Sequence, residues 1–462
     1  MILLLAYSAL LVGLGLWIGR RVKGASDFFV AGRGLGPGLI FSTMLAANIG
    51  AGSTVGATGL GYRDGLSAWW WVGSAGVGSL VLAFWIGPAI RRLAAAHDLR
   101  TVGDFLERRY GPSVRGIVAV LLWIGSLAIL AGQLIAIASI LNVAAGTPKW
   151  LACIIGGALI TIYSSAGGLK SGAWVNMVQL TVKMAGFAIA LPLALSAAGG
   201  WQAVQSMPVP SSSYWNFWSG GASGVVYVAM LGPAFVVSPG LLQKLYGASD
   251  DRAVRLGVGA NAAGLLIYAI VPVLLGMIAR SRFPDLPTPD LALPTILVRG
   301  LPAAVGTLGL AAVFSAELSS ADAVLFMLTT SLSQDLYKRF VAPASSDRQI
   351  LAVARLTTIV AGAIGTALAI VSPTVIGLLS IFYTLLGVSL FVPILGGLYV
   401  ARATTAEALA SIASGVGAML YVHVTTGGAG YGALTPALVG FHAAAAAFFV
   451  VLAARSHPVR MM

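Results

Sequence analysis

The chain has 462 residues, of which 58% are hydrophobic and only 9% are charged, and an excess of Lys and Arg gives it a net charge of +13. Soluble domains carry roughly a quarter charged residues, so this composition disfavours soluble enzymes, nucleic-acid-binding domains, disordered proteins and disulfide-stabilised secreted domains. The apolar residues form long continuous runs, which favour membrane helices over the alternating strands of a barrel. We therefore predict an all-α polytopic membrane protein.

Thirteen apolar runs approach the roughly 20 residues that a helix needs to cross the hydrocarbon core of a bilayer. The first run precedes Arg20 and Arg21, whereas a cleaved signal peptide carries its positive charges before its apolar stretch. We interpret it as a retained membrane span. In chain order the thirteen predicted spans are 2–19, 37–61, 66–90, 116–143, 150–166, 174–197, 222–243, 256–279, 303–333, 352–371, 374–400, 406–425 and 436–454.

The positions of Lys and Arg agree with thirteen spans. If the N-terminus lies outside, 21 of the 27 Lys and Arg residues fall on the cytoplasmic side, 5 fall outside and Lys183 lies within a span. Cytoplasmic loops carry an excess of Lys and Arg, so we expect a multi-pass protein of the inner (plasma) membrane with a cytoplasmic C-terminus. The lipid bilayer accounts for the net charge without a nucleic acid, and no obligatory protein partner is evident.

The connections between the predicted spans are short, so no second domain is expected. The longest are about 90–115, 198–221 and 280–302. The first of these reads as an amphipathic helix on the cytoplasmic side, because its charged and apolar residues alternate with a helical period.

Glycines are closely spaced in the predicted span 37–61, where Asn48, Ser53 and Thr54 also introduce polar groups. Small residues in a membrane helix commonly allow two backbones to pack closely. They also occur where a helix is unwound, so that its free backbone groups bind an ion or a solute at mid-depth. The combination of glycine with polar side chains favours the unwound helix.

The predicted span 303–333 carries polar groups on one face. Ala316, Ser319 and Ser320 are spaced i, i+3, i+4, which places them together on a helix. Serine hydroxyls in membrane helices often bond to their own backbone. Glu317 and Asp322 in the same span favour a functional role, because carboxylates inside a membrane are costly.

Four segments in order along the chain resemble motifs of the sodium:solute symporter family, between about Asp27 and Arg339. They are DFFVAGRGLGPGLIFSTMLAANIGAG, SSAGGLKSGAWVNMVQ, PGLLQKLYGASDDRAVR and SAELSSADAVLFMLTTSLSQDLYKRF. The resemblance implies sodium-coupled symport of a small organic solute by alternating access, with sodium as the coupling ion and no other cofactor. It also implies a transporter rather than an enzyme.

The resemblance further implies the leucine-transporter type of fold, in which two inverted five-helix repeats contain broken core helices. The whole chain, 1–462, then forms one transporter domain. Within it, 1–19 is an extra N-terminal helix, 37–197 the first repeat, 222–400 the second repeat and 406–454 a pair of C-terminal helices.

The family's conserved sodium site combines backbone carbonyls of the first core helix with a carbonyl and two hydroxyls of the eighth. The positions that match it here are Ala46, Ile49, Ala316, Ser319 and Ser320. Some family members hold a second sodium ion near an acidic residue of the fifth core helix. Asn176 and Asp322 stand at the positions of that second site, so it departs from the usual pattern.

The solute residues of sugar-transporting family members have no match in the corresponding stretches, GAGSTVG and LSAWWWVGSAG. A sugar would leave its hydroxyls unpaired there, so we expect a carboxylate or an amino acid, with backbone amides at Gly50–Gly52 facing its anionic group. The three adjacent tryptophans 69–71 could form the wall of a small pocket, but an interfacial belt is the favoured interpretation. The candidate solute contacts are Asn48, Ser53, Thr54, Gln133, Tyr227 and Phe235.

Lys183 lies about nine residues inside its predicted span, too far from the headgroups for its side chain to reach them comfortably. It follows Asn176 by seven residues and faces the same side of the helix. We hypothesise that Lys183 pairs with Asp322, or failing that with Glu317, and that this pair replaces the second sodium site.

Three alternatives remain open from the residues alone. A membrane enzyme would need convergent catalytic residues, and the four histidines are scattered. A channel would need a filter or ring motif. Within transporters, a proton-coupled or sodium-independent protein that uses Lys183 and Asp322 is the main alternative.

Overall fold

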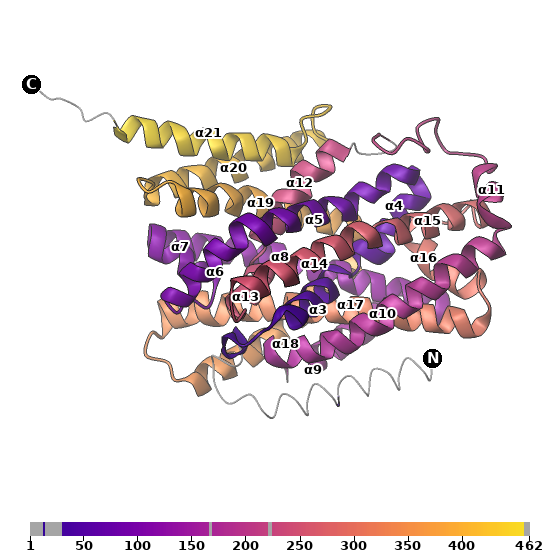
Figure 1. The fold of residues 1–462 in the computed structure, drawn as a ribbon, viewed down its shortest axis with the longest axis horizontal. Helices are drawn as coiled ribbons and strands as arrows, with labels where there is room; N and C mark the ends of the chain where they lie inside the picture. Colours follow the sequence, from indigo (N-terminus) through magenta and orange to yellow (C-terminus); the bar gives the residue numbers. More distant parts are fainter. Residues whose placement is uncertain (1–12, 14–29, 166–168, 220–223, 457–462) are drawn as a thin grey trace, which may run out of the picture.

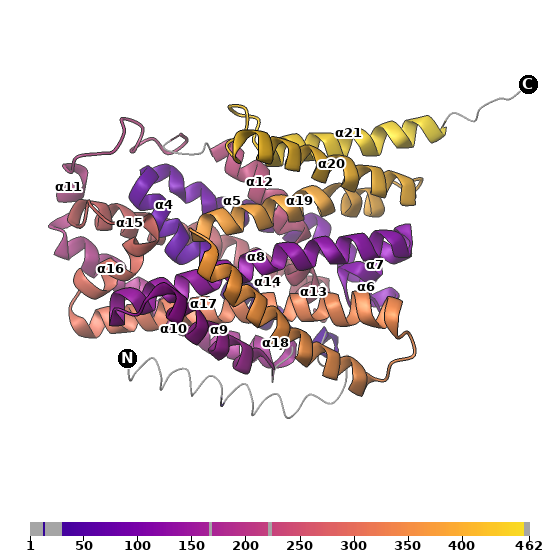
Figure 2. The ribbon, with the colours of Figure 1, turned by 180° about the vertical axis from the view of Figure 1, so that it is seen from behind.

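The structure, a computed structural model, describes residues 13, 30–165, 169–219 and 224–456. These residues form helices joined by short connections, with no strand among them. The long helices run side by side along the longest axis of the molecule (Figure 1), and the view from behind shows the same arrangement (Figure 2). The all-α prediction is confirmed for the described residues. Apart from Gly13, the predicted span 2–19 lies outside them.

The helices of the first half coincide with the predicted spans from 37–61 onward. The helix α7 lies within the connector 90–115, as expected, and begins with a capping box formed by Thr101 and Asp104. In chain order the helices are α3 (Pro37–Asn48), η2 (Gly52–Gly56), α4 (Ala57–Asp64), η3 (Gly65–Ala68), α5 (Trp69–Val81), η4 (Leu82–Ile86), α6 (Gly87–Ala96), α7 (Val102–Tyr110), α8 (Pro112–Ala145), α9 (Lys149–Ser165), α10 (Leu169–Ala197) and α11 (Gly200–Gln205).

The second half continues with the same kind of structure. Its helices are α12 (Gly224–Val237), α13 (Pro239–Tyr246), α14 (Asp251–Tyr268), α15 (Ile270–Arg282), η5 (Pro289–Leu291), α16 (Ala292–Arg299), α17 (Ala303–Thr330), η6 (Ser331–Val341), α18 (Asp347–Val371), α19 (Val375–Tyr399), α20 (Thr405–Thr426) and α21 (Pro436–Ser456).

Ten helical segments of the described residues, some of them made of consecutive helices, are long and apolar enough to cross a membrane. This number is lower than thirteen partly because α3 has only 12 residues and because Gly52–Ala96 is one continuous helical segment. Within that segment the chain turns at Gly65, whose φ of 71° suits glycine, between the predicted spans 37–61 and 66–90. The multi-pass membrane fold is supported, while thirteen spans and the inverted repeats stay predictions.

Two of the helices are interrupted in the middle of the molecule. The helix α3 ends at Asn48, and Ile49 leaves the helical conformation with φ −94° and ψ 85° before η2 begins. The helix α12 ends at Val237, and Ser238 separates it from α13, which starts with Pro239. The unwound helix expected at 37–61 is therefore present, and a second break begins the second half of the fold.

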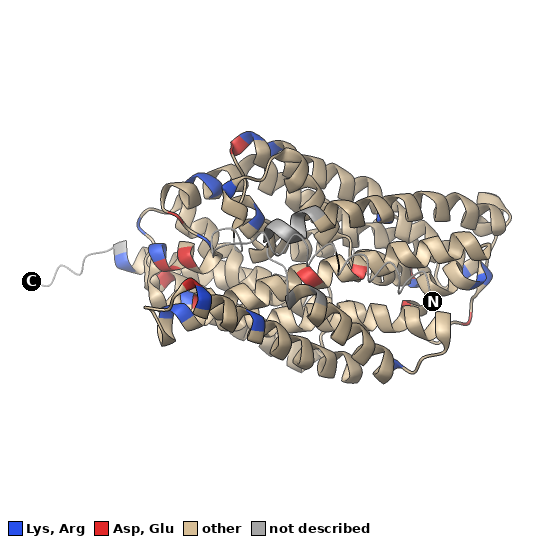
Figure 3. Ribbon diagram, turned by 90° about the horizontal axis from the view of Figure 1, so that it is seen from below, with Lys and Arg blue, Asp and Glu red and all other residues tan. Residues whose placement is uncertain are grey.

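Charged residues gather at one end of the molecule, the end where α21 terminates (Figure 3). One set of charged residues centres on Arg115, which is nearly buried and has its guanidinium 2.9 Å from Asp104, 2.8 Å from Glu107 and 2.8 Å from Asp335. These four residues, the Arg115 cluster, connect α7, α8 and η6. The one-sided distribution agrees with the predicted charge partition, and the cytoplasmic location of this end stays a prediction.

Candidate functional site

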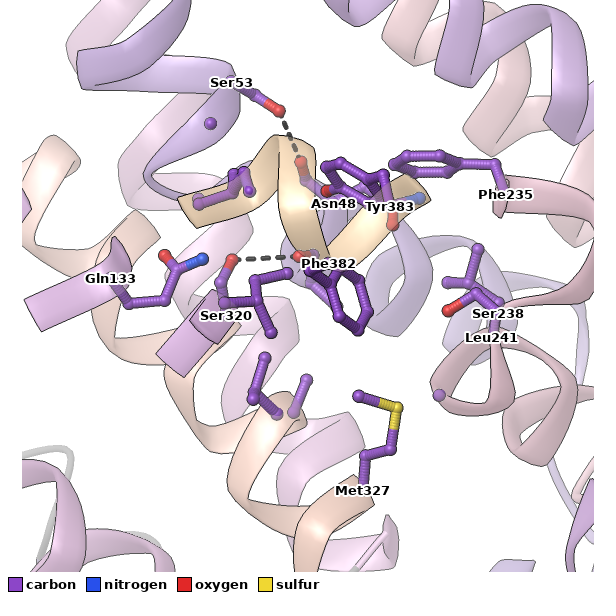
Figure 4. Close-up of a pocket in the computed structure, with 18 of the residues that line it drawn as sticks. Asn48, Ser53, Gln133, Phe235, Ser238, Leu241, Ser320, Met327, Phe382 and Tyr383 are labelled. Carbon is purple, nitrogen blue, oxygen red and sulfur yellow. Dashed lines mark hydrogen bonds between the residues drawn. The ribbon is translucent and has the colours of Figure 1, made fainter. Parts of the chain in front are cut away.

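A central cavity lies where the two helix breaks meet. Its polar lining comes from the break after α3, from α8, from the break before α13 and from α17, and its apolar lining comes largely from α19 and α17 (Figure 4). The residues that line it are Ala47, Asn48, Gly50, Gly52, Ser53, Ile129, Gln133, Phe235, Ser238, Gly240, Leu241, Lys244, Ser320, Ala323, Val324, Met327, Leu379, Phe382 and Tyr383. A mostly apolar concave site with a few polar groups is typical of small-molecule binding.

Side chains bind the backbone groups that the break after α3 frees. Gln133 accepts a hydrogen bond from the amide of Ala51 at 2.8 Å, and the Ser53 hydroxyl donates to the carbonyl of Asn48 at 2.7 Å. The Ser320 hydroxyl donates to the carbonyl of Ala47 at 2.9 Å, and Figure 4 shows this bond and the Ser53 bond at the cavity wall. The break is thus a hydrogen-bonded feature of the fold, as buried polar groups require.

The same bonds bear on the expectation that amides at Gly50–Gly52 face an anionic solute. The amide of Ala51 is already bound to Gln133, and the amides of Ser53 and Thr54 donate to the carbonyl of Gly50. Of the three expected amides, that of Ala51 is therefore already bound within the protein.

Four of the six candidate solute contacts line the central cavity, namely Asn48, Ser53, Gln133 and Phe235. The other two do not. Thr54 is fully buried and its hydroxyl lies 2.5 Å from Glu317, while the ring of Tyr227 packs against Trp71 with 5.6 Å between ring centroids.

Sequence reasoning missed Lys244. We assigned it to the cytoplasmic connector because the predicted span ended at residue 243, but the break at Ser238 places its helix, α13, beneath the cavity. Lys244 is only 4% exposed and lines the cavity. Among the described residues, none accepts a hydrogen bond from its ammonium group, and its main charge interaction is with Asp322. The sequence signal that could have drawn attention to it is the pair Gln243-Lys244 in PGLLQKLYGASDDRAVR, the third of the four family motifs.

The three tryptophans divide into two groups. Trp69 and Trp70 pack against Phe217 in the connector before α12, as residues of an interfacial belt would. Trp71 instead turns inward, where it is 3% exposed and packs against Tyr383, a residue of the cavity wall. The belt interpretation thus fits two of the three and is wrong for Trp71.

The predicted sodium ligands come together where α10 and α17 pack against α3. The side chain of Lys183 lies among them and is fully buried. Its Nζ is 2.6 Å from the carbonyl oxygen of Ala46, 3.1 Å from that of Ile49 and 2.6 Å from the hydroxyl of Ser319.

The other two predicted ligands lie at the edge of this site. The Ser319 hydroxyl is within 3.0 Å of both the Ala316 and the Ala46 carbonyl oxygens, so Ala316 is part of the same network. Ser320 bonds to Ala47 and faces the central cavity, so it does not contact Lys183.

The hypothesised Lys183–Asp322 pair does not form. No ion pair joins them in the described part of the chain, because the Lys183 side chain extends to the break after α3, while Asp322 interacts electrostatically with Lys244. Glu317, the second choice, is fully buried and interacts electrostatically with Lys183 without an ion pair. Asn176 donates a hydrogen bond to Thr43 at 3.2 Å, so the two residues expected at a second sodium site have different partners.

The chain matches the model of the sodium:solute symporter family over residues 28–415. It is 26% identical to the human sodium/iodide cotransporter over 449 residues, covering 89% of this chain and 67% of that protein. It is 27% identical to the sodium/pantothenate symporter of Escherichia coli over 479 residues, covering 95% and 92%.

A solved structure of a Na⁺-coupled sialic acid symporter, in a substrate-bound outward-open state, has a similar fold. The two structures superpose with a TM-score of 0.82 at 20% sequence identity, covering 98% of this chain and 96% of the other. At this identity the likeness establishes the shared fold.

Proposed function

Because the chain belongs to the sodium:solute symporter family, we propose that it is a secondary active transporter that carries a small organic solute, a carboxylate or an amino acid rather than a sugar, across the inner membrane. The solute binds in the central cavity, and the two halves of the fold open this cavity to one side of the membrane and then to the other. The named solutes of the relatives range from iodide to pantothenate and sialic acid, so the proposed solute class rests on the residues of the cavity.

The observation that carries the proposal is the position of Lys244 at the cavity. Lys244 is 4% exposed and has no hydrogen-bond acceptor among the described residues, so a carboxylate in the cavity would supply one through a charge-assisted hydrogen bond. The amide of Gln133 and the hydroxyl of Ser238 also line the cavity and offer further hydrogen bonds. The aromatic rings of Phe235 and Tyr383, whose centroids are 5.4 Å apart, form an apolar wall for the rest of the solute.

Two driving gradients are candidates. Sodium is favoured by family membership and by the names of the relatives. A proton-coupled or sodium-independent mechanism is favoured by one specific observation, the ammonium of Lys183 among the expected sodium ligands.

Uptake into proteoliposomes tests the proposed solute class. The purified protein is reconstituted, sodium and pH gradients are imposed separately, and uptake of labelled monocarboxylates, amino acids and hexoses is compared. Accumulation of a carboxylate or amino acid supports the proposal, and accumulation of hexoses alone contradicts it.

The variant Lys244→Met tests the role of the cavity lysine. It removes the charge and keeps much of the side-chain volume, and we expect it to weaken the apparent affinity for the transported carboxylate by about 10- to 100-fold, the usual range for a charge-assisted hydrogen bond. The exposed Arg348, on α18, provides the control Arg348→Met. Equal affinities in the two variants would show that Lys244 does not bind the solute.

A further inference from the structure

We propose that the ammonium group of Lys183 takes the place of the sodium ion at the cation site formed by Ala46, Ile49 and Ser319, so that this site does not bind sodium in this protein. The inference rests on the proposed transport function only for its physiological meaning. Its structural content concerns which cation the site holds, and this can be measured without transport.

The count of hydrogen-bond donors and acceptors supports an ammonium at this position. A lysine ammonium has three N–H donors and no acceptor. The three acceptors around Nζ are two backbone carbonyl oxygens at 2.6 and 3.1 Å and the Ser319 hydroxyl oxygen at 2.6 Å. The hydroxyl remains able to accept from Lys183 because its own proton is directed to the carbonyl of Ala46 or Ala316. Every donor of the ammonium is therefore satisfied.

The same three oxygen atoms are among those that a sodium ion would need. The carbonyls of Ala46 and Ile49 and the hydroxyl of Ser319 were all expected as sodium ligands, and each already accepts a hydrogen bond from Lys183. A sodium ion beside them would also meet a positive charge. Two like charges 4 Å apart repel enough to lower affinity by about a thousandfold at an effective dielectric constant of 20. The residues therefore do not fit a sodium ion while Lys183 is in place.

The bonds of Lys183 also connect the parts of the fold that a bound ion would connect. Lys183 belongs to α10, its two carbonyl acceptors belong to the break after α3, and Ser319 belongs to α17. A lysine tethered to α10 holds these elements together permanently, whereas a free ion does so only when bound. The protein thus has the positive charge at the helix break without any need for external sodium.

Two charged side chains among the described residues interact electrostatically with Lys183. They are Glu317, which attracts the positive charge of Lys183, and Lys244, which repels it. Glu317 is fully buried and its Oε1 lies 2.5 Å from the Thr54 hydroxyl, which also bonds to the carbonyl of Gly50. Glu317 is therefore the described carboxyl group that attracts the Lys183 charge, two residues before Ser319 on α17.

Thermal unfolding of the full-length protein in detergent tests the inference directly. Melting temperatures are measured in about 100 mM sodium chloride and in the same concentration of potassium chloride. A cation that binds only the folded protein raises its melting temperature. We expect no sodium-specific shift that depends on Ser319 in the natural chain. Lys183→Ala opens the site, and we expect this variant to gain a sodium-specific rise of a few degrees that Lys183→Ala combined with Ser319→Ala loses.

Two comparisons keep the result interpretable. Thr181→Ala changes an exposed residue two positions away on α10 and should respond to sodium as the natural chain does. If Lys183→Ala does not fold, Ser319→Ala alone still decides the question. A sodium-specific shift in the natural chain that Ser319→Ala removes would show that sodium binds beside Lys183 and would overturn the inference. A folded Lys183→Ala variant with no sodium response would overturn it as well.

Discussion

The Arg115 cluster offers a prediction whose magnitude follows from its geometry. Arg115 holds three carboxylates within 2.8–2.9 Å, and the side chains of Arg115 and Asp335 are only 8% and 6% exposed. Arg115→Met removes the cation and leaves Asp335 buried without its partner. Removing one member of a buried ion pair typically costs about 3–5 kcal/mol of unfolding free energy. For a chain of this length that corresponds to a fall in melting temperature of roughly 3–10 °C, extrapolating from smaller domains.

The assay is thermal unfolding in detergent, with Arg108→Met as the control because Arg108 is an exposed arginine on the neighbouring helix α7. Asp335→Asn added to Arg115→Met should recover part of the loss, because it removes the carboxylate that was left unpaired. A double-mutant cycle over the pair then gives a coupling energy above about 1 kcal/mol. An Arg115→Met variant that melts like Arg108→Met, or a second substitution that only adds to the loss, would refute this reasoning.

The remaining predictions concern the helix break and the topology. Gly50→Ala should abolish uptake with little effect on expression, because a Cβ at Gly50 would collide with the Ser320 side chain and lie 2.8 Å from Gln133 Oε1; uptake at half the natural rate or above would contradict this. For topology, a cysteine at the exposed Arg348 should react with a membrane-impermeant thiol reagent only from the cytoplasmic side, and a cysteine at the exposed Ser211 only from outside. Cys153 is buried and should give little background. The reverse labelling pattern would invert the predicted orientation.

Several features of the fold and site could be predicted from local sequence. The apolar runs located the helices from 37–61 onward because a membrane helix is specified by its own length and composition. Glycine and polar residues near Asn48 predicted the helix break, and the spacing of Ala316 and Ser319 placed both on one face of α17. Each of these inferences depends on neighbours within one helix.

The errors involve contacts between helices. The helical period of α10 shows which face of the helix Lys183 occupies, but it does not show which neighbouring helix lies opposite that face. We therefore predicted Asp322 as the partner of Lys183, whereas Lys183 binds the break after α3. Lys244 was assigned to a connector because the apolar run ends at residue 243. The run alone did not show that a new helix, α13, begins at Pro239. The amide of Ala51 could not be known to bind Gln133, which lies 82 positions away along the chain.

The most direct test of secondary active transport by this protein is accumulation of a labelled carboxylate by reconstituted proteoliposomes, with an imposed sodium or pH gradient as the only source of energy. A secondary active transporter raises the internal concentration of the solute above the external one, and Lys244→Met increases the external concentration that half-saturates this uptake. Such accumulation is expected under at least one of the two gradients, with loss when the gradient is collapsed. Movement of the carboxylate only down its own concentration gradient, whichever gradient is imposed, would contradict it.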